Sequence, residues 1–245
     1  LHLLSRRQRQ MCIRDRYHAY ANGYHTLGRS TLIEPIEWTS DGWCRTKQET
    51  VWLSENRQPE RKMELSDDFS KPELGLQWTF WKEYAPKALT FTEREMQVKA
   101  KGRTPADGRL LLVTAMDKCY ETEVEVRLGN GNTGGLLLYY NEEAYAGVAS
   151  DGKNFMVYRG EEKPLTVANQ IGKNFRVKLL NQGNRLKMSV SADGKSWEVL
   201  AQNVDVARLN HNVYKGFYAL RPALFAAGKG KTGFRNFRYR NAIPE

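Results

Sequence analysis

The sequence of 245 residues contains no long hydrophobic run. No stretch approaches the roughly 18 consecutive apolar residues that a membrane-spanning helix needs, and the N-terminus lacks the apolar core of a signal peptide. We therefore expect no membrane span. The hydrophobic content of 40% and the charged content of 27% are ordinary for a soluble globular protein. The length is sufficient for one or two domains, each with a substantial core.

Cysteine is also scarce, with three residues that fit neither a C-x-x-C pattern nor a metal-ligand spacing. Cys44 and Cys119 lie far apart, each in apolar-alternating sequence. We expect both to be buried structural thiols rather than a disulfide, a nucleophile or metal ligands. The sequence accordingly predicts no metal site and no cofactor.

The net charge of +10 raises the question of a nucleic-acid partner. Residues 1–16 contribute +4 of this charge, from five arginines and one aspartate, which leaves +6 for the remaining residues. There, lysine and arginine alternate with glutamate along apparent strands, as on a solvated face of mixed charge. No recognised motif accompanies the charge, so we expect no nucleic-acid partner.

The first sixteen residues show neither strand alternation nor a helical stripe. Their run R-R-Q-R-Q-M-C-I-R-D-R is typical of translated sequencing-adapter sequence, and a short basic arm or targeting tail is the competing interpretation. We favour the first and treat residues 1–16 as a non-native or disordered segment.

An all-β pattern begins at Ser66, where short apolar-alternating runs recur at the spacing of a sandwich or barrel. The predicted strands are 96–100, 110–114, 121–128, 135–140, 155–158, 175–180, 186–190, 216–220 and 233–240. Turn sequences that supply glycine or asparagine at positive φ separate them at 129–132, 150–154, 181–184 and 192–195.

Three details of this pattern can be tested. Alternation in Glu121–Leu128 places the glutamates and Arg127 on one wet face and Thr122, Val124, Val126 and Leu128 on the other. Phe234 and Phe237 fall on opposite faces of the last strand, which requires either a bulge or burial on both sides. The segment Asn203–Asn210 could form at most two helical turns before a strand resumes at Val213.

The stretch Thr26–Trp43 predicts a hairpin, with an apolar-alternating run followed by the turn signal Ser40-Asp41-Gly42. By spacing alone, Arg29 at its start is a solvated edge charge.

The segment Tyr17–Trp43 also carries the pattern G-R-x-T-x-x-x-x-x-x-W-x-x-D-G-W. It closely resembles the end of the catalytic domain of family 43 glycoside hydrolases, five-bladed β-propellers that act as β-xylosidases and α-L-arabinofuranosidases. Residues Ser66–Asn241 resemble the concanavalin-like β-sandwich appended to many of those enzymes. The resemblance implies the C-terminal part of an inverting glycosidase, for whose parent enzyme a periplasmic or extracellular location is favoured.

The resemblance divides residues 17–241 into three parts, which follow the segment 1–16. Residues 17–44 are the last strands of a truncated propeller, 45–63 form a linker, and 64–241 form an antiparallel β-sandwich of the concanavalin-like jelly-roll type. Within the linker, the apolar residues Val51–Leu53 are expected to dock on a neighbouring surface. The missing propeller domain and a xylo- or arabino-oligosaccharide are the implied partners.

Hydrolysis of a glycoside needs two carboxyl groups that flank the scissile bond. The remnant offers Glu34, Glu37 and Asp41. Glu34 and Glu37 point to opposite faces of a strand and cannot act as a pair. The resemblance assigns the catalytic carboxylates to the absent blades, so we predict no catalytic residue in this chain and no activity for it alone.

The resemblance does carry over a substrate-binding residue, Arg29, which matches the arginine that reaches the sugar from the last blade. A guanidinium suits this role because its fork of donors can bridge a hydroxyl and a carboxylate, while a structural ion pair is the alternative. His18 and His25 near the same edge are further candidates. A sandwich loop caps the pocket in the family. Residues 210–214 correspond to it here, with Tyr214 the nearest aromatic.

A stand-alone carbohydrate-binding module is the second functional hypothesis. Its sugar-stacking aromatics would come from Trp78, Trp81, Tyr139, Tyr140 and Tyr145. Adjacent strand residues face opposite sides, so only one of Tyr139 and Tyr140 is expected in the core. An exposed planar row of rings on one sheet would favour this module, and isolated aromatics would favour the glycosidase part.

Overall fold

The computed structural model describes residues 14–20, 24–46 and 63–242. They divide into two compact units. The first contains 14–20, residue 24 and 29–46, and the second contains His25–Gly28 and 63–242. The predicted docking of Val51–Leu53 lies outside the described residues.

The first unit is a three-stranded antiparallel sheet of β1 (Arg14–Ala19), β2 (Ser30–Trp38) and β3 (Cys44–Thr46), in the order β1-β2-β3. The predicted hairpin is confirmed, with Trp38 opposite Cys44. In its turn, Gly42 takes φ +83° and its N–H donates to the carbonyl of Thr39 at 2.9 Å. Strand β1 begins at Arg14, so residues 14–16 of the segment expected to be non-native or disordered pair with β2, with Arg14 opposite Pro35.

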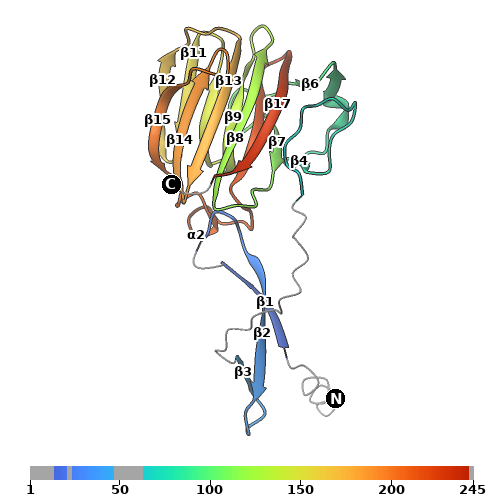
Figure 1. Ribbon diagram of the computed structural model, residues 1–245, viewed down its shortest axis with the longest axis vertical. Helices are drawn as coiled ribbons and strands as arrows, with labels where there is room; N and C mark the ends of the chain where they lie inside the picture. Colours follow the sequence, from blue (N-terminus) through green and yellow to red (C-terminus); the bar gives the residue numbers. More distant parts are fainter. Residues whose placement is uncertain (1–13, 21–23, 47–62, 243–245) are drawn as a thin grey trace. The chain divides into compact units, whose positions relative to one another are not determined.

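The second unit is all-β and consists of two seven-stranded antiparallel sheets packed face to face (Figure 1). We call one the aromatic sheet, in the order β12-β11-β10-β9-β16-β7-β4, and the other the charged sheet, in the order β15-β14-β13-β8-β17-β6-β5. The aromatic sheet comprises β4 (Trp78–Phe80), β7 (Arg109–Val113), β9 (Thr133–Asn141), β10 (Ala144–Ser150), β11 (Asn154–Arg159), β12 (Glu162–Ala168) and β16 (Arg221–Ala227). The charged sheet comprises β5 (Leu89–Thr92), β6 (Glu95–Lys99), β8 (Cys119–Leu128), β13 (Asn174–Gln182), β14 (Arg185–Ser191), β15 (Glu198–Asp205) and β17 (Lys231–Asn241).

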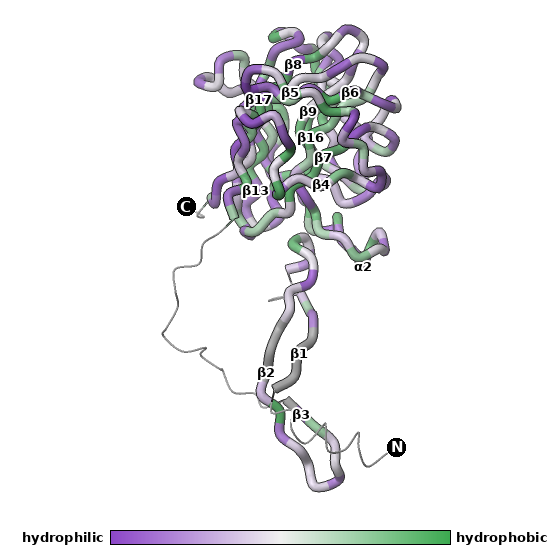
Figure 2. Tube along the Cα trace, turned by 90° about the vertical axis from the view of Figure 1, so that its right-hand side faces the viewer, coloured by the Kyte–Doolittle hydropathy of each residue, from purple (hydrophilic) through white to green (hydrophobic). Residues whose placement is uncertain are grey.

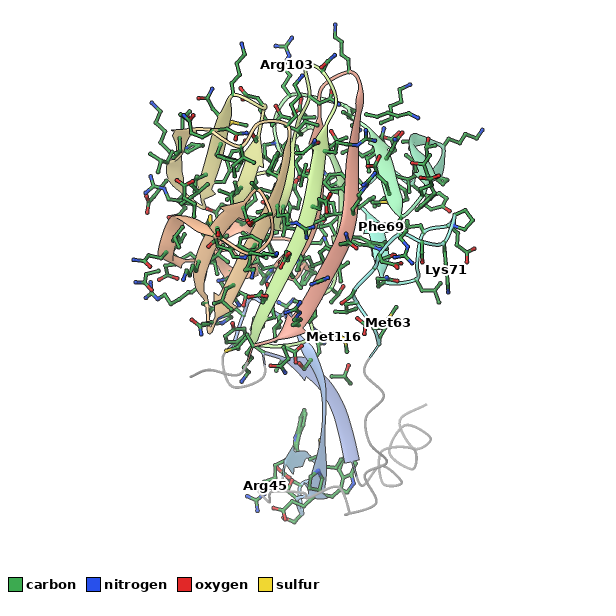
Figure 3. The ribbon with its side chains drawn as sticks, turned by 45° about the horizontal axis from the view of Figure 1, so that its top comes forward. Arg45, Met63, Phe69, Lys71, Arg103 and Met116 are labelled. Carbon is green, nitrogen blue, oxygen red and sulfur yellow. The ribbon has the colours of Figure 1, made fainter. Side chains whose placement is uncertain are left out.

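Helical structure in the described part of the chain is limited to short segments, the 3-10 turn Pro86–Ala88 and α2 (His211–Tyr214). None of the helices there has the length and apolarity that crossing a bilayer requires. The remaining connections are loops at the two ends of the sandwich, where Figure 3 labels Arg103 at one end and Met116 at the other. The predicted antiparallel β-sandwich is therefore confirmed, whereas the propeller origin of the first unit stays a prediction.

The main core fills the space between the two sheets. Val124 and Val126 from the charged sheet and Leu136, Leu138 and Tyr140 from the aromatic sheet are fully buried there. Hydrophobic residues accordingly concentrate along β9, β16 and β7, as Figure 2 shows.

Strand β17 contains the predicted irregularity in the form of a bulge. Its pairing with β8 shifts register between Arg235 and Arg238, and Asn236 takes φ +50°. The extra residue turns both Phe234 and Phe237 into the main core, although their spacing would place them on opposite faces of a regular strand.

Two predictions for residues 213–220 were wrong. Residues 203–205 end β15 and residues 206–210 form no helix, which is within the stated limit of two helical turns. The strand expected to resume at Val213 is replaced by helix α2, which contains Val213. Asn210 caps that helix by accepting from the N–H of Asn212 at 2.8 Å, so it starts the helix rather than ending one. The strand expected at 216–220 is a loop, and strand β16 begins only at Arg221.

The prediction of two buried thiols was also wrong. Cys44 is exposed and Cys119 is half-buried. Each residue opens a strand, where fewer neighbouring side chains cover it than in the middle of a sheet.

The outer face of the charged sheet was expected to be solvated, and it carries ion pairs between its charged side chains. Glu95 is buried and accepts from Arg127 and Arg235, whose Nε atoms each lie 2.9 Å from its Oε2. Burial by itself would raise the pKa of Glu95, but hydrogen bonds from Arg127 and Gln97 and the two arginine charges hold it below its usual value. Glu95 therefore joins β6 to β8 and β17 on this face.

We predict that Glu95→Gln lowers the free energy of unfolding by about 1–3 kcal/mol at pH 7, because it removes charge-assisted hydrogen bonds to two arginines. Urea denaturation measures this loss. The folded-state pKa of Glu95 is depressed, so its stabilisation is present above the unfolded-state pKa and is lost as the pH falls through the folded value. The difference between the two proteins should hence shrink below about pH 4.

Glu198→Gln is the matched control, since Glu198 is an exposed glutamate in β15 of the same sheet. It should change stability by less than about 0.5 kcal/mol. Equal midpoints for the Glu95 variant and this control at pH 7 would contradict the assigned role of Glu95.

Candidate functional site

Residues His25–Gly28 form part of the sandwich unit, although they lie inside the segment that resembles the end of a propeller. The buried Thr26 is their anchor. Its hydroxyl donates to Oδ1 of Asn184 at 2.8 Å, and its carbonyl accepts from the N–H of Leu220 at 2.7 Å. Because a buried polar group needs a partner, these two bonds fix the segment on the sandwich.

Two neighbours of Thr26 complete the attachment. Leu27 packs against the main core. Gly28 takes φ +79°, its N–H donates to the carbonyl of His25 at 3.0 Å, and a Cβ on it would lie 3.3 Å from Cβ of Ala219. Glycine at this position allows both the turn and the close approach to Ala219. The next residue along the chain is Arg29.

The sandwich side of this contact is the loop 215–220, which follows α2. Tyr140, in the main core, donates its hydroxyl to the carbonyl of Lys215 at 2.6 Å. The ring of His211 stacks on Phe217, with ring centroids 4.9 Å apart and an interplanar angle of 23°. The loop is thus fixed from the core and from α2, and it presents Phe217 with 78% of its surface exposed.

Tyr214, the predicted pocket aromatic, is the last residue of α2. Its hydroxyl donates to Oε1 of Glu161 at 3.3 Å, and burial together with the charge of Glu161 raises its pKa. It lines a hollow of about 370 Å³ together with Asn141, Glu142, Glu143, Val213 and Lys215. The phenol is therefore engaged on the sandwich surface, and Phe217 is the more exposed aromatic of this region.

The other predicted binding residues belong to different units. His25 is half-buried in the sandwich unit, whereas His18 and Arg29 belong to the first unit. His18 is exposed in β1 opposite Thr31, and the guanidinium carbon of Arg29 lies 5.1 Å from the centre of the Tyr20 ring. Within the first unit, Arg29 is consequently held by a cation–π contact.

The carboxylates of the hairpin have local roles. Glu37 pairs with Arg45, whose Nε lies 2.5 Å from Oε1 of the glutamate. The hydroxyl of Thr39 donates to Asp41 and, with the backbone N–H of Trp43, holds the pKa of Asp41 below its usual value. The side chain of Glu34 lies outside the described residues. Across the described ranges, no group of three histidine, cysteine, aspartate or glutamate side chains could hold a metal ion.

Sequence reasoning missed both Thr26 as an anchor and Phe217 as the exposed aromatic. Phe217 follows directly after Gly216, which takes φ +72°, and such a glycine signals a loop rather than the predicted strand. For Thr26 there is no local signal, because its partner Asn184 is 158 positions away in sequence.

The two packed antiparallel sheets and the short connecting loops define a concanavalin-like β-sandwich domain. A family model described as the beta xylosidase C-terminal concanavalin A-like domain matches residues 66–240, and the chain belongs to this family. A curated relative is the non-reducing end alpha-L-arabinofuranosidase BoGH43B of Bacteroides ovatus. It is 34% identical over 85 residues, which cover 32% of this chain and 16% of that protein.

Solved structures share the fold at low identity. The chain matches the xyloglucan PUL GH43B of Bacteroides ovatus with a TM-score of 0.73 and 17% identity, over 94% of this chain and 51% of that one. For the GH43 BlXynB protein of Bacillus licheniformis the TM-score is 0.68 with 20% identity, over 89% and 48%. For the xylan beta-1,4-xylosidase of Bacillus halodurans C-125 it is 0.68 with 19% identity, over 93% and 50%. The chain thus spans about half the length of these proteins.

We predict that Thr26→Val lowers the free energy of unfolding of the sandwich by about 1 kcal/mol, because it removes the hydrogen bond to Asn184. The urea midpoint of the full chain measures this change. Thr31→Val is the control, since Thr31 is an exposed threonine in β2 of the first unit. An unchanged midpoint for Thr26→Val would show that residues 25–28 do not contribute to the sandwich in solution.

Proposed function

We propose that this chain is the C-terminal part of a glycoside hydrolase that acts on xylan- or arabinan-type plant polysaccharides or oligosaccharides. In this proposal the sandwich packs on the catalytic domain of an inverting glycosidase and helps to complete its sugar-binding site. The family membership supports the general class, and the relatives, a xylosidase and an arabinofuranosidase, support the substrate type.

The observation that carries the proposal is the anchored segment His25–Gly28. It holds the chain to the loop that presents Phe217, immediately before the sequence continues into Arg29, the proposed sugar-binding residue. An aromatic ring on a fixed loop is a suitable wall for a sugar because it offers an apolar face at low entropic cost. We therefore assign the pocket-completing role to Phe217 in place of Tyr214.

Catalysis in this proposal depends on residues that the chain does not supply. An inverting glycosidase places an acid and a base roughly 6.5–9.5 Å apart across the bond. Glu37 and Asp41 are bound to Arg45 and Thr39 in their own hairpin. Arg29 remains protonated at any working pH, so it can bind a hydroxyl but cannot transfer a proton. The acid and the base are assigned to the propeller domain of the parent enzyme.

The alternative, a module that stacks sugars on a row of exposed rings, is less well supported. Trp78 and Tyr140 are buried in the main core, and Tyr139 is fully buried on the other face of its sheet. The expectation that only one of Tyr139 and Tyr140 would be buried was wrong, because both faces of β9 are covered. Of the five candidates, only Trp81 and Tyr145 are partly exposed.

We predict that the chain by itself releases no nitrophenol above background from nitrophenyl β-xyloside or nitrophenyl α-arabinofuranoside. General acid and base catalysis each contribute about 10²–10⁴-fold, and both are lacking in this proposal. Arg29→Ala serves as the control. Turnover well above buffer that this substitution abolishes would contradict the proposal.

We further predict that the sandwich restores activity when it replaces the matched half of the Bacillus halodurans xylosidase. In that fusion, Phe217→Ala should lower kcat/KM by about tenfold, because one wall of the sugar site is lost. Tyr84→Ala is the matched control, since Tyr84 is 80% exposed on the sandwich but lies outside the loop 215–220. Equal effects of the two substitutions would exclude a role for the loop in the sugar site.

A further inference from the structure

Arg221, the first residue of β16, has an unsatisfied guanidinium edge. Its Nε and Nη2 atoms are both fully buried, and neither has a hydrogen-bond partner among the described residues. These two nitrogens form one side of the planar guanidinium, so their N–H groups point in the same direction as a pair. A buried donor without a partner is costly, and here two adjacent donors of a charged group are in this state.

The protein shows elsewhere what this edge of an arginine binds. Arg127 places the same two atoms, Nε and Nη2, on the two carboxylate oxygens of Glu95. Arg208 also directs its Nε and Nη2 to a carboxylate oxygen, that of Glu161. The geometry of a paired edge matches the two oxygens of a carboxylate. At Arg221 the corresponding acid is missing from the described residues.

Tyr139 provides a third unsatisfied group at the same place. Arg221 and Tyr139 are direct cross-strand partners on β16 and β9, and the fully buried hydroxyl of Tyr139 has no hydrogen-bond partner in the described part of the chain. Burial and the negative charge of Glu142 raise the pKa of Tyr139. Glu142 does not accept from the Tyr139 hydroxyl, because its Oε1 already accepts from Nε1 of Trp81 at 3.0 Å and pairs with Lys82. Glu142 is therefore engaged with Trp81 and Lys82.

Aromatic rings flank the guanidinium. Its central carbon lies 5.4 Å from the Trp81 ring centre and 5.9 Å from that of Tyr218, and these two rings are 4.9 Å apart. Trp81 also meets Tyr139 edge to face at 5.2 Å. Tyr218 is 41% exposed and belongs to the loop 215–220, and entry of a ligand would require its side chain to rotate away from Trp81. Burial lowers the pKa of Arg221, and an anion would reverse that effect.

We propose that Arg221, Tyr139, Trp81 and Tyr218 form a binding site on the aromatic sheet for a sugar that carries a carboxylate, a hexuronate. The paired edge of Arg221 holds the carboxylate, the hydroxyl of Tyr139 donates to a ligand oxygen, and the two rings contact the apolar face of the sugar. The choice of a sugar as the carrier of the carboxylate rests on the proposed function. The carboxylate requirement rests only on the unsatisfied donors.

The test is a separate titration of the full chain with each of D-glucuronate, D-glucose and acetate. Binding is measured by tryptophan fluorescence and by calorimetry. Trp81 lies against Arg221, so saturable binding should change its emission. We expect glucuronate to bind at least about tenfold more tightly than either glucose or acetate, because only glucuronate presents both the charge and the ring. Arg221→Gln should weaken glucuronate binding by at least about tenfold and Tyr139→Phe by several fold.

Arg185→Gln is the matched control, since Arg185 is an exposed arginine on the charged sheet and pairs with Asp205. It should leave binding unchanged. Arg221→Lys is the second variant in case Arg221→Gln does not fold. Lysine keeps the charge but lacks the paired edge, so glucuronate affinity should still fall.

Three results would overturn the proposal. The first is the absence of saturable glucuronate binding up to about 50 mM, and the second is equal binding of acetate or glucose and glucuronate. The third is unaltered glucuronate affinity in a folded Arg221 variant. The pentosidase assay of the fusion does not depend on these measurements, so failure of the hexuronate site and failure of the proposed function give separate results.

Discussion

The constraint on which much of this structure depends is the burial of the aromatic sheet on both faces. Leu136 and Leu138 point into the main core, while Leu137 and Tyr139 point the other way, and all four are fully buried. The loop before β7 covers part of the outer face, where a Cβ on Gly108 would lie 2.4 Å from Cε2 of Phe225. A strand covered on both sides has no wet side for polar groups, so any polar atom there must find a partner.

The outer face of the charged sheet, in contrast, carries charged side chains that pair with one another. Glu123 and Glu125 of β8 face Arg176 of β13, and Nη2 of Arg176 lies 2.8 Å from Oε2 of Glu125. Acids and bases on this face lie in adjacent strands, where their side chains can pair across the ladder. The contrast makes Arg221 unusual, because Arg127, Arg176 and Arg235 on the charged sheet pair with glutamates, whereas Arg221 lies among rings.

The accuracy of sequence reasoning varies from strand to strand in both sheets. Alternation located the β8 strand within a few residues of its observed start, because one of its faces is charged. Strands β10 and β12 gave no such signal. Strand β10 consists mainly of alanine, glycine and valine, and β12 is exposed along its length apart from Val167. The assumption that a strand has a single buried face also produced the wrong expectation for Tyr139 and Tyr140. The anchoring of Thr26 could not be predicted, because the contact joins residues far apart in sequence.

The loop 215–220 contributes one aromatic ring to each of the two proposed sites, Phe217 to the sugar site of the parent enzyme and Tyr218 to the hexuronate site. Lys215 takes φ +57° and Gly216 φ +72°, and the hydroxyl of Tyr140 holds the carbonyl of Lys215 from inside the core. At its other end, Leu220 donates to Thr26. Between these fixed ends, Phe217 faces solvent and Tyr218 covers Arg221. Ordering a loop on binding costs conformational entropy, and a loop held at both ends has already lost much of that freedom. In the proposed function and at the proposed hexuronate site, the anchoring of His25–Gly28 would serve recognition as well as stability, because it fixes the loop that carries Phe217 and Tyr218.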